Sequence, residues 1–327
     1  MKTLIEAFPN NLLEAIKIGE SNVFSKPKNE IKNIIICGLG GSGIGAKIVQ
    51  NWTQDEINVP ITCVNEYVLP AFAGKDTLVI GCSYSGNTEE TTMAIDQAHE
   101  KGCHIIGITS GGNLAGFCKK NKYDCIIVPG GNPPRSALAF SLVQLLHYLV
   151  VQAFILPDCL NSIHKASALL SKESEDIQLI GRKLADYLHK KVGVYYAETK
   201  YEGVVVRARQ QFNENAKYLG WHHVIPEMNH NELVGWGGGD TRFAPVFFRT
   251  VDVHPRNAKR FQITVDAIKK KSAEVFILDA KGDTMIERAL YFIHVVDWAS
   301  YYLCDLNKVD IMDIDIIDYL KSELADF

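Results

Sequence analysis

Short, uninterrupted runs of apolar residues, each followed by a glycine-rich or polar turn, are the feature that most limits how this chain can fold. In the first half of the chain these runs occupy residues 33–37, 61–65, 77–83, 104–109 and 124–129. A strand with one solvated face alternates apolar and polar residues, so continuous runs indicate strands buried on both faces. Helical patterns separate the runs, beginning near Ser42 and covering 88–101 and 113–120. This alternation predicts an α/β fold with a parallel, doubly wound sheet and right-handed crossovers.

The second half of the chain repeats this plan with little sequence similarity to the first. Its apolar runs lie at 191–198, 242–250 and 273–280, and its helical patterns lie at 201–219, 256–270, 284–304 and 313–325. Because 327 residues exceed the usual size of one domain, we expect two doubly wound α/β domains, residues 1–156 and 157–327. The charged stretch 163–191 predicts a helix that links them. A helix predicted over 136–156 is apolar on almost every side, so we expect it to be buried at a domain or subunit contact.

Composition and charge exclude several classes of function. With 47% hydrophobic and 22% charged residues, the chain has the composition of an ordinary globular protein. Its formal net charge of -4 does not favour a nucleic-acid partner or an anionic membrane. The apolar runs are too short to span a bilayer, and the first residues do not form a secretory signal. We therefore expect a cytoplasmic protein with no membrane partner.

The cysteines and histidines give no sign of a metal site. None of the eight cysteines belongs to a CxxC pair, and several lie inside apolar runs. This usage is typical of a reducing cytosol, where cysteine acts as a small buried hydrophobic residue. His222, His223 and His230 form the single near-cluster of histidines, without cysteines at ligand spacing. The sequence therefore predicts no metal ion and no cofactor.

A glycine-rich string, CGLGGSGIG at 37–45, follows the first predicted strand and precedes a helix. A turn of this kind directs backbone N–H groups and a helix N-terminus toward an anion. Gly38, Gly40 and Gly43 also match the GxGxxG spacing of dinucleotide-binding proteins, and Glu66 lies where the acidic residue of that motif would follow. A tight turn with a purely structural role is the third interpretation.

A second string, CSYSGNTEET at 82–91, places small polar side chains at the entry of another helix. Ser83, Ser85 and Thr88 supply hydroxyl groups, and Asn87 supplies an amide. Asn87 or Thr88 could simply cap the helix, but one group is enough for a cap. Several short donors without a bulky neighbour suit a phosphate monoester. The loop has no lysine and the chain has no GxxxxGK[ST] motif, which favours the phosphate of a small metabolite over a nucleoside triphosphate.

Together these strings resemble the sugar isomerase (SIS) domain, and the full pattern resembles the bifunctional phosphoglucose/phosphomannose isomerase family. The motifs follow in order through both halves: GLGGSGIG, CSYSGNTEET, TSGGNLAG (109–116), PPRSAL (133–138), FNENAK (212–217) and EMNHNELVGW (227–236). The resemblance implies two SIS domains and a homodimer with shared active sites. It also implies an intramolecular oxidoreductase of glycolysis and gluconeogenesis, converting glucose 6-phosphate and mannose 6-phosphate to fructose 6-phosphate.

The resemblance implies roles for single residues. Glu214 corresponds to the proton-transfer base, Arg135 to the arginine that stabilises the enediolate, and His230 to the ring-opening histidine that the partner subunit contributes. The implied phosphate ligands and loop residues are Ser42, Ser83, Ser85 and Thr88, with Gly41, Gly43 and Asn87 in the substrate-binding loop. Lys321 matches a C-terminal lysine near the sugar, but the Pro-Thr pair that often precedes this lysine is missing here.

The chemistry of Glu214 and Arg135 can be stated without reference to a family. One carboxylate can take a proton from the carbon beside a carbonyl and return it to the neighbouring carbon through a cis-enediol. Asn213 and Asn215 flank Glu214 and could orient it. Arginine stays protonated, so Arg135 would offer a fixed charge to the enediolate oxygen. The simpler alternatives are a solvated helix glutamate and a surface arginine.

Ring opening needs a group that moves a proton near neutral pH, and histidine does so. His230 is the candidate, with His222 and His223 as rivals. Three other functions remain as alternatives: a non-catalytic phosphosugar-binding regulator, an isomerase of another sugar phosphate, and a dehydrogenase that uses the turn at 38–43. A regulator would not need Glu214, Arg135 and His230 together. Use of mannose 6-phosphate besides glucose 6-phosphate stays open at this stage.

Overall fold

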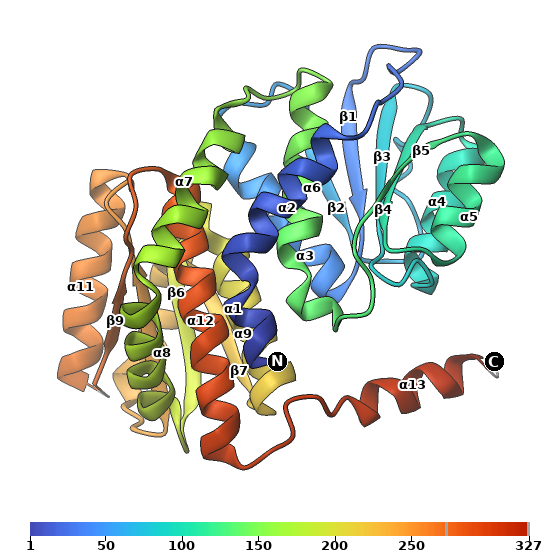
Figure 1. The fold of residues 1–327 in the computed structure, drawn as a ribbon. Coiled ribbons are helices and arrows are strands. Elements are labelled where there is room, and N and C mark those ends of the chain that lie inside the picture. Colours follow the sequence, from blue (N-terminus) through green and yellow to red (C-terminus); the bar gives the residue numbers. More distant parts are fainter. Residues whose placement is uncertain (272–273, 326–327) are drawn as a thin grey trace.

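The computed structural model describes residues 1–271 and 274–325, which form two parallel β-sheets covered by helices on both faces (Figure 1). The first sheet has five strands in the order β2-β1-β3-β4-β5. The strands are β1 (Asn33–Cys37), β2 (Ile61–Val64), β3 (Thr77–Cys82), β4 (His104–Thr109) and β5 (Asp124–Ile127). Every neighbouring pair is parallel. The doubly wound fold and the strands predicted for the first half are confirmed.

Strand β1 shows why its sequence is apolar throughout. Ile34 and Ile36 pack in the cluster that contains α3 (Gly40–Thr53) and α6 (Leu138–Val151). Ile35 and Cys37 pack instead with α4 (Glu89–Glu100) and α5 (Gly112–Asn121) on the other face. These four side chains are at most 1% exposed. Successive strand residues point to opposite faces, so a strand between two helix layers needs an apolar residue at every position.

The second sheet has four strands in the order β7-β6-β8-β9. The strands are β6 (Val192–Glu198), β7 (Gly220–Ile225), β8 (Phe243–Arg249) and β9 (Phe276–Asp279). The helices α8 (Ser174–Leu188), α9 (Glu202–Ala216) and α12 (Met285–Asn307) cover one face, and α11 (Pro255–Lys271) covers the other (Figure 1). The sequence did not predict β7, because GWHHVI is a half-buried edge strand without an apolar run. Residue 273, where the last predicted strand began, lies outside the described residues.

The helices between the two sheets differ from the prediction. One linking helix was expected over 163–191, but the chain forms α7 (Asp158–Lys172) and α8, and both pack against α12. Two further helices, α1 (Lys2–Glu6) and α2 (Phe8–Glu20), precede the first strand and were not predicted. The apolar helix expected over 136–156 is α6, which is buried but ends at Val151. Since α2, α3 and α7 cover α6 within the same chain, its apolar surface needs no subunit contact.

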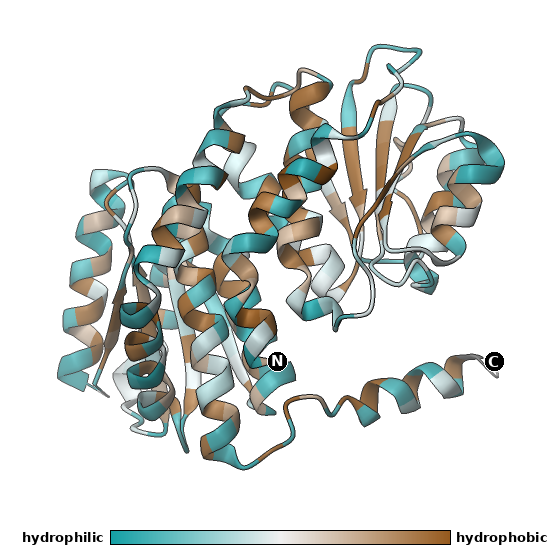
Figure 2. Ribbon diagram, viewed as in Figure 1, coloured by the Kyte–Doolittle hydropathy of each residue, from teal (hydrophilic) through white to brown (hydrophobic). Residues whose placement is uncertain are grey.

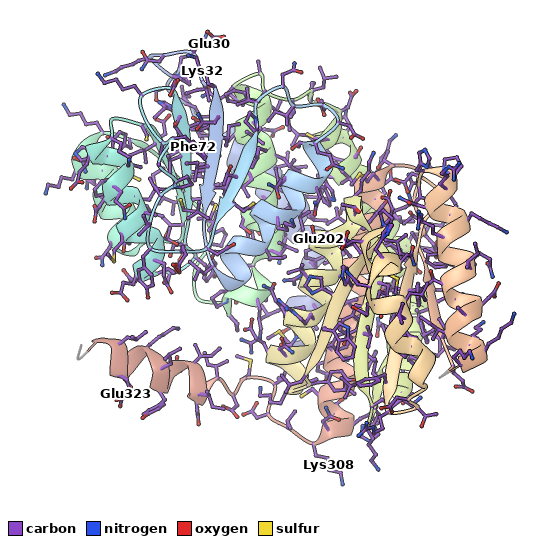
Figure 3. The ribbon with its side chains drawn as sticks, turned by 180° about the vertical axis from the view of Figure 1, so that it is seen from behind. Glu30, Lys32, Phe72, Glu202, Lys308 and Glu323 are labelled. Atoms are coloured by element: carbon purple, nitrogen blue, oxygen red, sulfur yellow. The ribbon has the colours of Figure 1, made fainter. Side chains whose placement is uncertain are left out.

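The two halves of the chain meet where α3 packs closely against α9. Gly203 is required at this contact, because a Cβ there would lie 2.8–3.0 Å from atoms of Ile48. The Gly203 N–H donates to Asn51 Oδ1 at 2.9 Å, and Lys47 pairs with Glu202 at 2.8 Å. Figure 3 shows Glu202 at this junction. We propose residues 156 and 157, between α6 and α7, as the boundary of the two domains.

The last helix, α13 (Asp315–Ala325), projects from the body of the molecule beneath the first domain (Figure 1). It lies close to the helix predicted over 313–325. Its apolar positions, brown in Figure 2, are open to solvent, with Ile316 86% and Tyr319 66% exposed. Glu323 on α13 and Lys308 at the end of α12 mark this extended segment in Figure 3. No helix within the described part of the chain is long and apolar enough to cross a membrane.

Candidate active site

The hydroxyl groups predicted to bind phosphate lie together where β1 and β3 end. Ser42, in the first turn of α3, accepts a hydrogen bond through Oγ from the Tyr84 N–H at 2.9 Å. Ser83 Oγ and Thr88 Oγ1 are 2.8 Å apart, and the Thr88 N–H donates to Ser83 Oγ at 3.3 Å. The sheet order β2-β1-β3 makes this edge a topological switch point. In doubly wound folds, ligands bind outside the carboxyl ends of the strands at such a point.

Helix capping does not account for the polar side chains of this loop. Thr88 does occupy the N-cap position of α4, but its hydroxyl bonds Ser83 rather than the helix. Ser85 Oγ accepts the Asn87 N–H at 3.2 Å, and Asn87 Oδ1 accepts the Asn113 N–H at 3.0 Å. Ser85 and Asn87 are both exposed to solvent. The loop is therefore held by its own hydrogen bonds and presents polar groups outward.

The glycine-rich turn brings the phosphate loop against the segment that carries Arg135. A Cβ at Gly41 would lie 2.8 Å from the carbonyl carbon and oxygen of Pro134, so only glycine allows this approach. A Cβ at Gly43 would lie 2.3 Å from the Gly38 oxygen. The cavity that Gly41, Ser42, Ser83 and Pro134 line has a volume of about 10 Å³. Since this is about the room for one water molecule, a sugar would have to lie on the open side of the loops.

Arg135 lies in the short helix η1 (Pro134–Ser136), between the two domains, with 3% of its side chain exposed. Each guanidinium nitrogen has a partner from the second half of the chain. Nε donates to Asn215 Oδ1 at 2.8 Å, Nη2 donates to the Ile311 carbonyl at 2.7 Å, and Nη1 lies 3.5 Å from Glu214 Oε2. The alternative of a surface arginine is therefore excluded. A buried cation held on three sides can act as a fixed charge.

Glu214 lies in the last turn of α9, and 28% of its side chain is exposed. The prediction that Asn213 and Asn215 orient this carboxylate is wrong. Asn213 Nδ2 donates to the Tyr218 carbonyl at 2.7 Å, and Asn215 binds Arg135. Adjacent residues of a helix point in different directions, so neighbours in sequence are poor partners for one another. The contact that orients Glu214 is its ion pair with Arg135.

His230 lies far from the Arg135–Glu214 pair within one chain. It belongs to η3 (Glu227–His230), which follows the carboxyl end of β7. Because β6 and β7 are parallel, α9 runs back between them, and Glu214 and His230 lie at opposite ends of this unit. The 15 residues of α9 span about 22 Å. The rival His222 lies within β7, where burial lowers its pKa to about 4.

Lys321 also lies outside the assembled residues. It is on α13, where 69% of its side chain is exposed and its Nζ lies 3.8 Å from Asp318. Of the predicted site residues, the structure thus gathers the phosphate loop, the glycine turn, Arg135 and Glu214, but neither His230 nor Lys321. Within residues 1–271 and 274–325, no three His, Cys, Asp or Glu side chains come together in a way that could hold a metal ion.

The sequence interpretation missed the partners of Arg135. Asn215 belongs to the FNENAK motif, and its spacing of four residues from Gln211 and eight from Arg207 marks one polar face of α9. That periodicity could have identified this face of α9 as the one that contacts a buried polar group. The Ile311 carbonyl and the Tyr84 N–H carry no such signal, because any residue type offers these backbone groups.

Two doubly wound domains with a hydroxyl-rich loop at the first switch point define a protein of the SIS type. Residues 29–155 match the SIS domain family, and residues 179–324 match the bacterial phospho-glucose isomerase C-terminal SIS domain. More closely still, the chain belongs to the bifunctional phosphoglucose/phosphomannose isomerase family, which confirms the resemblance seen in its motifs. It is 34% identical to the enzyme of that name from Caldicellulosiruptor bescii, over 97% of both chains.

Other comparisons agree with this membership. The bifunctional phosphoglucose/phosphomannose isomerase of Thermoplasma volcanium is also 34% identical, over 89% of this chain and 91% of the relative. A crystal structure of a putative phosphosugar isomerase from Clostridium difficile 630 superposes with a TM-score of 0.76 at 17% identity. That match covers 98% of this chain and 97% of the other, and it shows that both share the two-domain fold.

Proposed function

We propose that this protein interconverts glucose 6-phosphate and mannose 6-phosphate with fructose 6-phosphate. The relatives that match it over nearly their whole length are bifunctional phosphoglucose/phosphomannose isomerases. The observation that carries the proposal is the pair formed by Arg135 and Glu214, 3.5 Å apart. The cation is 3% exposed and the carboxylate 28%. A proton-transfer base must reach the substrate, whereas the charge that stabilises an enediolate must stay in place.

The proposed reaction uses Glu214 twice. Glu214 takes the proton from C2 of the open-chain aldose, the C1–C2 double bond forms, and the carbonyl electrons move to O1. Arg135 stabilises the resulting enediolate oxygen, which then takes up a proton. The C2 hydroxyl gives up its proton as the C2 carbonyl forms, and Glu214 returns its proton to C1. Glucose and mannose 6-phosphate differ in configuration at C2 and give the same planar enediol, so one site can serve both.

The phosphate is proposed to bind the outer side of the loop between β3 and α4. Ser85 and Thr88 would supply hydroxyl donors at this surface, and the N-terminus of α4 would add its positive dipole end. Ser42 and Ser83, the other two proposed ligands, are buried and would reach the phosphate from behind the loop. Support comes from the fixed cluster of Ser83 and Thr88 and from the solvent exposure of Ser85. Gly41 and Gly43 would hold this loop beside Arg135, and Asn87 would keep its shape.

His230 is proposed to open the sugar ring in the site of a partner subunit. In one chain His230 and Glu214 are separated by the length of α9, so a site that uses both needs residues from two chains. The proposed assembly is therefore a homodimer with shared active sites. Lys321 would join a site if α13, which projects from this chain, docks against the same or the partner subunit.

The test of the proposed function is a coupled assay of the purified protein. Glucose 6-phosphate, mannose 6-phosphate and fructose 6-phosphate are supplied in turn, and formation of the other two is followed. Turnover of all three supports the proposal. Binding without turnover would favour the regulator alternative, and turnover of an amino-sugar phosphate alone would favour another isomerase. A nicotinamide absorbance change when the protein is given NAD and a hexose phosphate, without coupling enzymes, would favour the dehydrogenase.

A further inference from the structure

Behind Arg135, a buried polar network joins the two domains. Asn215, with no exposed surface, accepts the Arg135 Nε–H through Oδ1 and donates from Nδ2 to Ser300 Oγ at 2.9 Å. Ser300 Oγ in turn donates to the Asp297 carbonyl at 2.8 Å. A guanidinium can only donate hydrogen bonds, so the amide oxygen must be the atom that faces Arg135. Both functional groups of Asn215 are therefore used, and its orientation is fixed.

The same face of α9 also holds the main chain of Arg135. Arg207 Nη2 donates to the Arg135 carbonyl at 3.0 Å and pairs with Asp297 at 3.2 Å. Gln211 Nε2 donates to Asp297 Oδ1 at 2.7 Å. Arg207, Gln211 and Asn215 follow at intervals of four residues, which places them in one row along the helix. This row fixes Arg135 at both its carbonyl and its guanidinium.

The network holds its buried carboxylate against Arg207 and places a neutral group against the Arg135 guanidinium. The buried carboxylate, Asp297, lies against Arg207, and the group that contacts Arg135 Nε is the uncharged amide of Asn215. Burial raises the pKa of the Asp297 carboxyl, and Arg207 and Gln211 oppose that rise. A carboxylate at position 215 would make a stronger bond to Arg135 but would also cancel much of its charge. The neutral amide positions the guanidinium and leaves its charge available.

Glu214 is the carboxylate that contacts Arg135, and it loses its charge during the proposed reaction. When Glu214 takes the proton from C2, it becomes neutral at the step in which negative charge appears on the substrate oxygen. The positive charge of Arg135 is then free to stabilise that oxygen. This transfer works only if no other carboxylate competes for Arg135, which is the role that a neutral residue at position 215 secures.

We propose that Asn215 is a positioning residue that fixes Arg135 without neutralising it, so that its charge passes from Glu214 to the enediolate. The proposal rests on the proposed function. It distinguishes Asn215 from a residue that merely packs the domain contact, because a packing role would not change how the site discriminates between a charged and an uncharged inhibitor.

The test compares Asn215→Asp and Asn215→Leu with the unmodified protein. Turnover is measured with fructose 6-phosphate, and inhibition is measured with arabinonate 5-phosphate and arabinitol 5-phosphate. These inhibitors are matched in carbon number, but only the first carries a carboxylate at the reacting end. Asn215→Asp should lower kcat about tenfold and raise the inhibition constant of arabinonate 5-phosphate about tenfold. The inhibition constant of arabinitol 5-phosphate should not change. Asn215→Leu frees the guanidinium and should lower kcat about 10²-fold with little change in KM.

Asn213→Ala is the matched control. It removes one hydrogen bond from the same end of α9 without touching Arg135. It should lower the melting temperature and leave kcat and the ratio of the two inhibition constants unchanged. Normal kcat and a normal inhibitor ratio in Asn215→Asp would overturn the proposal. If Asn215→Asp does not fold, Asn215→Leu decides, and a normal kcat in that variant would overturn the proposal.

A parallel Arg135→Ala variant separates this inference from the proposed function. If the unmodified protein isomerises none of the three hexose phosphates, the proposed function fails. If the unmodified protein does isomerise them and Arg135→Ala retains full turnover, the proposed function stands, but the role of Arg135 fails and the role of Asn215 fails with it. If Arg135→Ala is inactive and both Asn215 variants behave as the unmodified protein does, the proposed function stands. In that case only the role of Asn215 is wrong.

Discussion

At the carboxyl edge of the first sheet, Ser42, Ser83 and Thr88 gather without a charged side chain among them. The corresponding edge of the second sheet lies between β6 and β8, since the order β7-β6-β8 places its switch point there. Glu198 and Arg249 line a cavity of about 110 Å³ at that edge, and Arg249 forms an exposed ion pair with Asp279. The two edges share a topology but present different chemistry to a ligand.

The second domain contributes to the candidate site from its opposite end. Glu214 and Asn215 lie at the C-terminal end of α9, which is remote from the carboxyl edge of their own sheet. The comparison teaches that duplicated topology does not duplicate a site. In the first domain, the hydroxyl-rich loop lies at the carboxyl ends of the strands. In the second domain, the carboxylate and the buried partner of the Arg135 side chain lie at the C-terminal end of a helix.

The largest expected effect comes from removing the carboxylate that the second domain contributes. Glu214→Gln keeps the shape and polarity of the side chain but cannot accept a proton. It should lower kcat for every substrate by about 10²–10⁴-fold, the range for loss of a general base. Stopped assays with each hexose phosphate measure this. Near-normal turnover, with exchange of the C2 proton into solvent, would show that another residue is the base.

The proposed sharing of sites between chains can be tested by pairing two defective subunits. Differently tagged Glu214→Gln and His230→Ala chains are co-expressed, and the heterodimer is isolated. If Glu214 and His230 of different chains form a site, one of the two sites is intact, and activity should be roughly half that of the unmodified dimer. If each site uses a single chain, neither site is intact and activity stays low.

His230→Ala alone tests whether His230 opens the sugar ring. It should slow turnover of cyclic glucose 6-phosphate and spare the open-chain erythrose 4-phosphate, because only the cyclic sugar needs ring opening. Equal impairment of both substrates would contradict the ring-opening role. A fully active monomer would contradict the shared site.

Deleting hydroxyl groups at the carboxyl edges of the two sheets tests which edge binds the phosphate. Ser85→Ala and Thr88→Ala at the first edge should each raise KM about 10- to 100-fold, the equivalent of about 1.5–3 kcal/mol for a hydrogen bond to a charged group. Thr250→Val removes a hydroxyl that lines the cavity of the second edge and should leave KM unchanged. If KM changes with Thr250→Val but not with the first two, the phosphate binds the second domain.

The smallest expected effect is that of a chelator. Glu214 and Arg135 can perform the proposed proton transfers by themselves, so EDTA should not change kcat or KM. Activity is measured before and after dialysis against EDTA, with a zinc-dependent enzyme as the positive control. Loss of activity that zinc restores would contradict this expectation.

Local features of the sequence were enough to predict most elements of the fold. The run Ile34–Ile36 requires a strand between two helix layers, and the glycines after it require a tight turn. The motif CSYSGNTEET likewise predicted a loop of small polar side chains at the entry of a helix, and the structure adds that Ser83 and Thr88 are hydrogen-bonded to one another there. Periodicity and short-range spacing are properties of the chain itself, so they can be recognised before the structure is known.

The tertiary structure decided which distant residues meet. Arg135 binds the side chain of Asn215, 80 residues away, and the carbonyl of Ile311, 176 residues away. The same packing covers α6 with α2 and leaves α13 outside the body. It also separates His230 from Glu214 along α9. Contacts of this kind depend on how whole helices pack, and a backbone carbonyl such as that of Ile311 has no signature in the sequence because every residue has one.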